Sequence, residues 1–142
     1  MTATDRPDTC TRRVLIADDR ARTRRAPGAA LATHAAFELI GEAADGEEAL
    51  AAVERLRPDI VIIDVRMPRL DGIAATMQIK ARWPGIRVVA HSLAEELRAD
   101  ALAAGADAFV PKGAPVRELF SALEPAGCNQ AKADARRSTE YS

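Results

Sequence analysis

The stretch that decides the fold is Ile60-Val61-Ile62-Ile63-Asp64-Val65-Arg66-Met67-Pro68. Its first four residues are branched and apolar, and the run ends abruptly in a carboxylate. A continuous apolar run, rather than an alternating one, is typical of a strand buried on both faces of a parallel sheet. Asp64 then follows the C-terminal end of this strand, and that edge is where open α/β sheets bind ligands.

Length and composition predict one packed domain. The chain has 142 residues, of which 48% are hydrophobic and 29% charged, and its net charge is −1. This balance favours a folded core over disorder, and it argues against non-specific binding to nucleic acid or to an anionic membrane. Cys10 and Cys128 have no metal-binding spacing, so a reduced, cytoplasmic setting is expected. No apolar stretch approaches the roughly 20 residues that cross a bilayer.

Hydrophobic patterns divide the chain into alternating strands and helices. The predicted strands span residues 14–17, 37–43, 59–63, 86–90 and 108–110. The predicted helices span residues 20–36, 45–57, 72–82, 93–104 and 116–123. Pro27-Gly28 interrupts the first helix, which is therefore either kinked or late to begin, because proline removes a backbone hydrogen bond. We expect a flexible leader over residues 1–12, a folded domain over 13–124 and a disordered tail over 125–142.

Five strand–helix units in succession predict an α/β fold. The expected architecture is flavodoxin-like: a doubly wound, five-stranded parallel sheet of order 2-1-3-4-5 with five helices. In this order the crevice for a ligand lies between the first and third strands. Asp18-Asp19 and Asp64 follow those two strands, so the three carboxylates are expected to meet there.

Four predicted strand ends carry complementary polar groups, which are Asp18-Asp19, Asp64, Ser92 and Lys112. Clustered carboxylates repel one another unless a cation neutralises them, and Mg²⁺ prefers oxygen ligands of this kind. A carboxylate beside such a metal can attack a phosphoryl group, while a lysine and a hydroxyl can bind the phosphoryl oxygens. Each residue alone also has a structural explanation, as a turn former, a helix cap or a surface lysine. Their joint placement favours a site.

At this point the sequence resembles a known family, the receiver domains of bacterial two-component response regulators. The resemblance covers about residues 13–123 and is closest to receivers that accompany helix-turn-helix output domains. The matching stretches are Val14 to Asp19, Gly46 to Leu50, Pro58 to Pro68 with Asp71-Gly72, and Ala104 to Lys112.

The resemblance implies a role for each residue of the site. Asp64 would accept a phosphoryl group from a histidine kinase or a phosphotransfer protein. Mg²⁺ would be held by Asp18, Asp19, Asp64 and the backbone carbonyl of Arg66. Lys112 would pair with the phosphoryl group, Ser92 would be the switch hydroxyl, and Phe109 would change rotamer with it.

The same resemblance implies a cytoplasmic, stand-alone signalling switch. It would not be an enzyme beyond Mg²⁺-dependent self-phosphorylation and self-dephosphorylation. A downstream protein partner would bind residues 93–123, without direct DNA binding and without a membrane. The sequence leaves open whether two copies form a homodimer, and it names neither the kinase nor the target.

Several positions depart from the family pattern. Leu93 replaces the small residue that usually follows the switch hydroxyl, and Gly113 follows Lys112 where many relatives have proline. His91 replaces an apolar residue, and a strand histidine is more often packed in the core than a metal ligand. Arg20, Arg22, Arg24 and Arg25 form either a solvated basic face or an altered kinase-docking surface.

The sequence leaves two other functions to compare with this one, and the departures motivate the first of them. The first is a receiver-like module that binds its partner without phosphorylation. The second is an aspartyl-phosphate phosphohydrolase, which is disfavoured because Arg66 stands where such an enzyme needs a second acid.

Overall fold

The computed structural model describes residues 11–67 and 70–124. Its strands are β2 (Arg12–Ala17), β3 (Phe37–Ala43), β4 (Ile60–Ile63), β5 (Arg87–Ser92) and β6 (Ala108–Pro111). Its helices are α1 (Ala21–Ala32), α2 (Gly46–Leu56), α3 (Gly72–Arg82), α4 (Arg98–Ala103) and α5 (Val116–Leu123), with a short 3-10 turn, η2 (Glu95–Leu97), before α4. The expected leader and tail lie outside the described residues, except for Thr11 and Arg12.

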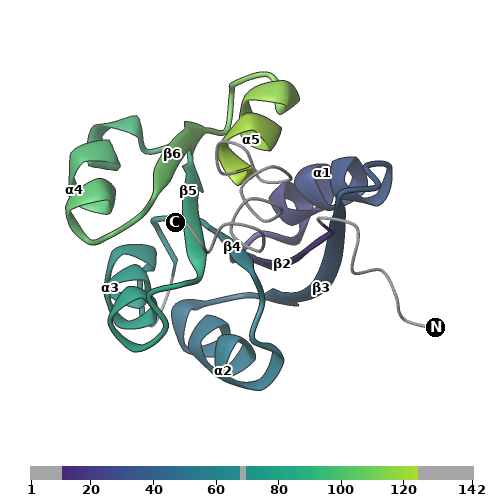
Figure 1. The fold of residues 1–142 in the computed structure, drawn as a ribbon. Helices are drawn as coiled ribbons and strands as arrows, with labels where there is room; N and C mark the ends of the chain where they lie inside the picture. The colour runs from purple at the N-terminus through teal and green to yellow at the C-terminus, as the bar shows by residue number, and fades with distance from the viewer. Residues whose placement is uncertain (1–10, 68–69, 125–142) are drawn as a thin grey trace, which may run out of the picture.

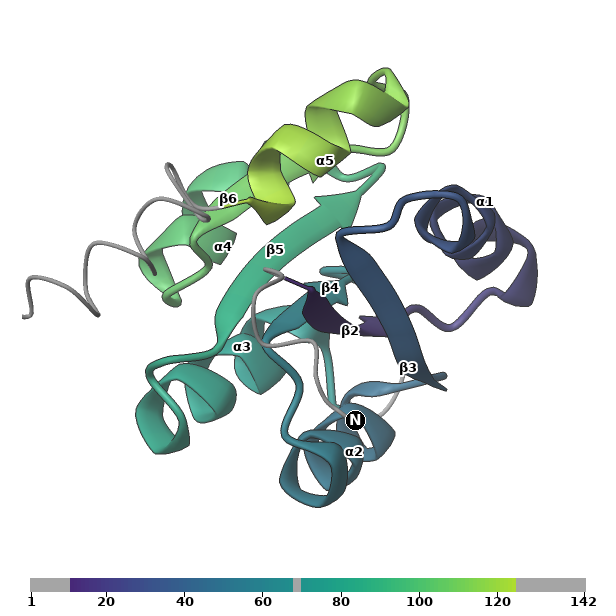
Figure 2. The same ribbon diagram turned by 45° about the vertical axis from the view of Figure 1, so that its right-hand side comes forward.

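The five strands form one parallel sheet in the order β3-β2-β4-β5-β6. In chain order this is 2-1-3-4-5, so the predicted doubly wound topology is confirmed. Figures 1 and 2 show α1 and α5 on one face of the sheet, with α2, α3 and α4 on the other. Among the described helices, none is long and apolar enough to cross a membrane.

The central strand β4 supplies side chains to both hydrophobic cores. Ile60 and Ile62 belong to the core under α1 and α5, whereas Val61 and Ile63 belong to the core under α2, α3 and α4. All four side chains are fully buried. Burial on both faces explains why this strand is continuously apolar, as the sequence pattern predicts.

Two of the predicted helix starts are fixed by aspartate caps. The Asp45 carboxylate accepts a hydrogen bond from the amide of Glu48 at 2.8 Å, and the Asp71 carboxylate accepts one from the amide of Ala74 at 2.8 Å. Each bond satisfies an amide that has no partner within the helix. The cap of α3 also anchors the segment that follows Asp64, since α3 begins only eight residues after it.

The first helix does not begin late. Helix α1 begins at Ala21 and contains Pro27 within it. Pro27 and Leu31 are four residues apart and both buried, so they lie on the same face of the helix. Packing of this face against the sheet offsets the cost of about 3 kcal/mol for a proline inside a helix. The side chains of residues 21–26, which include three of the four clustered arginines, lie outside the described part of the chain.

The predicted helix over residues 93–104 is wrong at its start. Strand β5 continues to Ser92, the η2 turn follows, and regular α-helix begins only at Arg98. A helix that began at residue 93 would place Leu93 on the same face as Leu97, but the Leu93 side chain is 66% exposed. The reason is local: the amide of Ala94 donates to Oγ of Ser92 at 3.1 Å, which favours a turn over a helix at this point.

Candidate functional site

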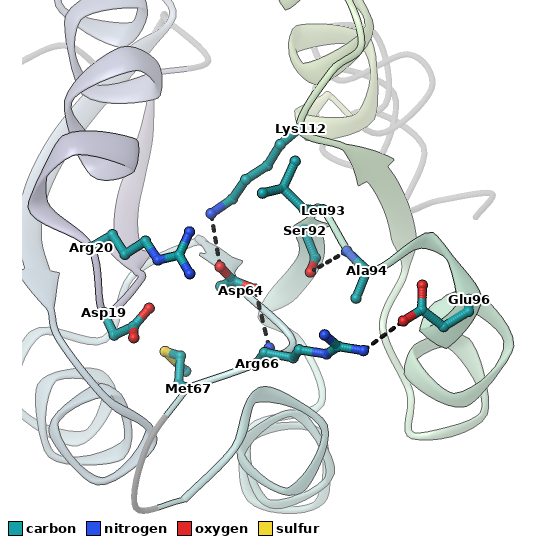
Figure 3. Close-up of a pocket in the computed structure, with 10 residues that line it drawn as sticks. All are labelled: Asp19, Arg20, Asp64, Arg66, Met67, Ser92, Leu93, Ala94, Glu96 and Lys112. Atoms are coloured by element: carbon teal, nitrogen blue, oxygen red, sulfur yellow. Dashed lines mark hydrogen bonds and ion pairs between the residues drawn. The ribbon is translucent and has the colours of Figure 1, made fainter.

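A cavity of about 470 Å³ opens at the carboxyl edge of the sheet (Figure 3). Its walls come from the segments that follow β2, β4, β5 and β6. The residues that line it are Asp19, Arg20, Asp64, Arg66, Met67, Ser92, Leu93, Ala94, Glu96 and Lys112. The predicted convergence of strand ends is therefore observed, because separate loops bring the acids, the hydroxyl and the amine to one cavity.

Lys112 links the carboxylate of Asp64, which lines the cavity, to the buried carboxylate of Asp18. Its Nζ atom lies 2.5 Å from Oδ2 of Asp18 and 2.7 Å from Oδ2 of Asp64. The three side chains are nearly buried, with exposed fractions of 9%, 5% and 10% for Lys112, Asp18 and Asp64. Buried charges are tolerated when they are paired and hydrogen-bonded, and the shared ammonium meets this condition for both acids.

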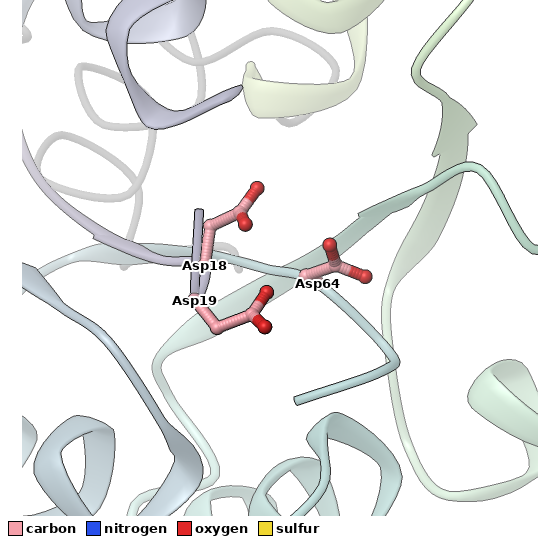
Figure 4. A group of neighbouring side chains, drawn as sticks. All are labelled: Asp18, Asp19 and Asp64. Atoms are coloured by element: carbon pink, nitrogen blue, oxygen red, sulfur yellow. The ribbon is translucent and has the colours of Figure 1, made fainter. Parts of the chain in front are cut away.

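Asp18, Asp19 and Asp64 together form a cluster that could hold a metal ion (Figure 4). Each supplies one carboxylate oxygen, and these oxygens lie within 4.8 Å of one another. Asp19 is exposed, whereas the other two are buried, so the cluster faces the open side of the cavity. An all-oxygen set of this kind, open to water on one side, fits Mg²⁺, which usually keeps several water ligands.

Backbone contacts fix the position of Asp64. Its Oδ1 atom accepts a hydrogen bond from the amide of Arg66 at 3.1 Å, and the amide of Gly72 donates to the carbonyl of Val65 at 2.8 Å. Gly72 allows the start of α3 to approach this closely, because a Cβ atom there would lie 2.0 Å from the carbonyl oxygen of Asp64. Gly72 is thus needed for the shape of the loop that carries Asp64.

Ser92 and Phe109 end up on neighbouring strands. Ser92 is the last residue of β5 and is almost fully buried, and its carbonyl accepts a hydrogen bond from the amide of Lys112 at 3.0 Å. The Phe109 ring, on β6, is buried, and the guanidinium of Arg98 lies 4.9 Å from its centroid. The structure thus records an inward Phe109, and its predicted change of rotamer stays a prediction.

His91 is a packed residue, as expected for a strand histidine. Its Nδ1 atom lies 3.0 Å from the carbonyl oxygen of Val110, and its ring is half-buried beside a smaller, mainly apolar cavity near Pro27 and Leu119. Burial lowers the pKa of His91 below its usual value of 6.5, and the nearby Lys112 ammonium acts in the same direction. The imidazole is therefore neutral at pH 7.

The sequence did not identify Glu96 or its contact with Arg66 at the edge of the cavity. Nη2 of Arg66 lies 2.5 Å from Oε2 of Glu96, and both side chains are about two-thirds exposed. The amide of Arg20 donates to Oδ1 of Asp18 at 2.9 Å. Arg66 and Glu96 are exposed and lie 30 residues apart in the chain. A contact of this kind leaves no hydrophobic period in the sequence, so Glu96 could not have been found from the hydrophobic pattern.

Comparison with known proteins relates the chain to response regulators. The family model of the response regulator receiver domain matches residues 14–124. The response regulator GacA of Pseudomonas viridiflava is 36% identical over 113 residues, which are 78% of this chain and 53% of GacA. The chain spans about half the length, or less, of several curated relatives that it matches.

Two solved structures have the same fold. The response regulator domain of Thermotoga maritima CheB is 27% identical with a TM-score of 0.68, and the match covers 93% of this chain and 98% of that one. A chain of the CheX–CheY–BeF₃–Mg²⁺ complex of Borrelia burgdorferi is 32% identical with a TM-score of 0.70, and the match covers 78% and 85%.

Proposed function

Because the chain belongs to the response regulator receiver domain family, we propose that it is a phosphoacceptor of a two-component signalling system. Asp64 accepts a phosphoryl group from a phosphohistidine on a histidine kinase or a phosphotransfer protein. A carboxylate oxygen of Asp64 attacks the phosphorus atom, and an O–P bond forms as the N–P bond breaks. The electron pair of that bond stays on the imidazole nitrogen, and the product is an acyl phosphate.

The same cavity would hold the metal ion that this step requires. Asp18, Asp19, Asp64 and the backbone carbonyl of Arg66 are the proposed ligands of Mg²⁺. When bound, Mg²⁺ neutralises the charge on the phosphoryl oxygens. The clustering of the three carboxylate oxygens within 4.8 Å supports this assignment.

Lys112 and Ser92 would bind the phosphoryl group once it is attached. The observation that carries the proposal is the position of the Lys112 ammonium, which contacts the Asp64 carboxylate from inside the cavity at 2.7 Å. The hydroxyl of Ser92 lies on the same cavity wall. A phosphoryl group that draws in this hydroxyl would leave space for Phe109 to change rotamer, and so would alter the surface of residues 93–123.

This surface would recognise a downstream protein partner. We propose that residues 13–124 act as the receiver domain in the cytoplasm, and that this domain acts through protein contacts rather than by direct binding to DNA. Modification can shift the domain between two states only if the phosphoryl group interacts differently with each, and the contacts with Ser92 and Lys112 supply that difference.

The test is direct phosphorylation. Incubation of the full chain with acetyl phosphate and Mg²⁺ should add about 80 Da, the mass of one phosphoryl group, by intact mass spectrometry. The adduct should be absent in Asp64→Asn and present in Asp100→Asn, since Asp100 is an exposed aspartate on α4. An unmodified wild-type protein at saturating donor would refute the proposal.

A binding module that works without phosphorylation is the second candidate. The exposed Leu93 side chain at the cavity wall favours it, because it narrows the approach of a phosphodonor. In that case Asp64→Ala would bind the downstream partner as tightly as the wild-type protein does, whether or not a phosphodonor is present.

A further inference from the structure

The ion pair between Arg66 and Glu96 lies at one edge of the phosphorylation cavity (Figure 3). Both side chains line this cavity, yet neither has a part in the chemistry proposed above. They come from different elements. Arg66 lies in the segment between β4 and α3, and Glu96 lies in the η2 turn that leads into α4. The pair therefore ties the segment that carries Asp64 to the turn that follows Ser92.

Arg66 is tethered to the phosphoacceptor through its backbone. Its amide donates to Oδ1 of Asp64 at 3.1 Å, while its side chain extends outward to Glu96. The Arg66 side chain starts only two residues after Asp64, and both residues line the same cavity. Whether it pairs with Glu96 or with a group attached to Asp64 depends on which of them offers the stronger negative charge.

Phosphorylation changes this balance of charge. The acidic residues that line the cavity are Asp19, Asp64 and Glu96, and the basic ones are Arg20, Arg66 and Lys112. A phosphoryl group replaces the single charge of Asp64 by one of about −1.5 to −2. Lys112 is already shared between two carboxylates. An additional cation is therefore favoured at the phosphoryl group.

Arginine is well suited to supply it. A guanidinium binds phosphate-like oxygens through two parallel hydrogen bonds, which are stronger than a neutral contact. An ion pair between two side chains that are about two-thirds exposed contributes little, because water competes for both partners. The Arg66 side chain is therefore expected to leave Glu96 and to bind the phosphoryl group instead.

We propose that Arg66 is a phosphoryl-binding residue that Glu96 holds at the edge of the cavity until Asp64 is modified. This inference rests on the proposed function. On modification the guanidinium moves to the phosphoryl oxygens, and Glu96 loses its partner. The η2 turn is then no longer tied to the segment after β4, so the modification of Asp64 reaches residues 93–123 by a second route besides Ser92 and Phe109.

Beryllofluoride with Mg²⁺ tests this exchange in the full chain, because it mimics a phosphoryl group on an aspartate without being hydrolysed. Its affinity is measured by calorimetry for the wild-type protein, Arg66→Gln, Glu96→Gln and the double variant. Glu95→Gln is the matched control, since Glu95 is exposed in the same turn. Arg66→Gln and Glu96→Gln change side chains only, so the backbone carbonyl of residue 66 stays in place. Thermal unfolding verifies that each variant is folded.

Arg66→Gln should weaken the affinity about tenfold, which is typical for loss of a hydrogen bond to a charged group. Glu96→Gln should tighten it by about threefold, because the competitor for the guanidinium is gone. The double variant should match Arg66→Gln, and Glu95→Gln should match the wild-type protein.

Equal affinities of the wild-type protein and Arg66→Gln would overturn the inference. So would an effect of Glu96→Gln that persists in the Arg66→Gln background. Failure of the proposed function gives a different result: the wild-type protein would then bind beryllofluoride no better than Asp64→Asn does.

Discussion

Lys112 and Asp64, 48 residues apart in the chain, form an ion pair of 2.7 Å in which both side chains are about nine-tenths buried. The same ammonium contacts Asp18 at 2.5 Å. A single lysine therefore bridges two acids that would otherwise face each other inside the protein. A bound metal ion would add positive charge beside these three side chains, and a phosphoryl group on Asp64 would add negative charge.

Replacement of Lys112 should destabilise the domain more than the loss of an exposed ion pair does. In Lys112→Met the carboxylates of Asp18 and Asp64 stay buried without a cation, and the free energy of unfolding at pH 7 should fall by about 3 kcal/mol. Urea unfolding measures the change. Mg²⁺ should recover part of the loss, because it neutralises the same carboxylates.

The matched control for this variant is Arg117→Met, which removes an exposed cation from α5. Its unfolding free energy should stay within about 0.5 kcal/mol of the wild-type value. If Lys112→Met were as stable as this control, the ion pair with Asp64 would not contribute to the fold.

Asp19 should be required for Mg²⁺ binding without being required for folding. It is the exposed member of the acid cluster, whereas Asp18 and Asp64 are buried and paired with Lys112. Calorimetry should detect weak Mg²⁺ binding to the wild-type protein, none to Asp19→Ala, and wild-type binding to Asp100→Ala. Equal affinity in Asp19→Ala would remove this residue from the metal site.

The sequence predicted the interior of the site better than its rim. Asp64 and Lys112 could be placed together because parallel strands all end at one edge of the sheet, whatever their separation in the chain. The contact between Arg66 and Glu96 could not, since exposed side chains obey no hydrophobic period and their pairing depends on the path of two loops.

Leu93 shows a second limit of pattern analysis. It stands four residues before Leu97 and so matches a helical period. However, the hydroxyl of Ser92 accepts a hydrogen bond from the amide of Ala94, which forms a turn there, and the helix begins later. By contrast, the prediction for the four apolar residues of β4 is confirmed. A strand that is buried on both faces is apolar at every position, and this continuous run is visible in the sequence.

Gly72→Ala should distort the loop that carries Asp64. A Cβ atom at this position would lie 2.0 Å from the carbonyl oxygen of Asp64 and 2.7 Å from Cα of Val65, and both are backbone atoms with little freedom to move. We expect a loss of about 3 kcal/mol in unfolding free energy, at the upper end for overpacking. Phosphorylation by acetyl phosphate should slow as well.

Gly85→Ala is the comparison for this glycine. Apart from Gly85 itself and its two chain neighbours, no heavy atom of the described residues lies within 4 Å of the Cβ that the substitution adds. Stability should therefore change by less than about 0.5 kcal/mol. Equal effects of the two substitutions would mean that the approach of α3 to Asp64 is not the constraint.

His91 should make the stability of the domain depend on pH. Burial lowers the pKa of His91 below 6.5, and the Lys112 ammonium lowers it further, while the carbonyl of Val110 and the carboxylates of Asp18 and Asp64 act in the opposite direction. The unfolded chain then binds a proton at His91 more readily than the folded protein does. Stability from this residue is complete above pH 6.5 and is lost as the pH falls through 6.5 toward the folded-state pKa.

Substitution of this histidine should remove that part of the pH dependence. Urea unfolding at several values between pH 7.5 and 5.0 should show a smaller loss of stability on acidification in His91→Leu than in the wild-type protein. All other titrating groups are shared, so the difference between the two curves isolates His91. Parallel curves would mean that the folded protein accepts a proton at His91 as readily as the unfolded chain, and that burial of the ring beside Val110 does not disfavour its charge.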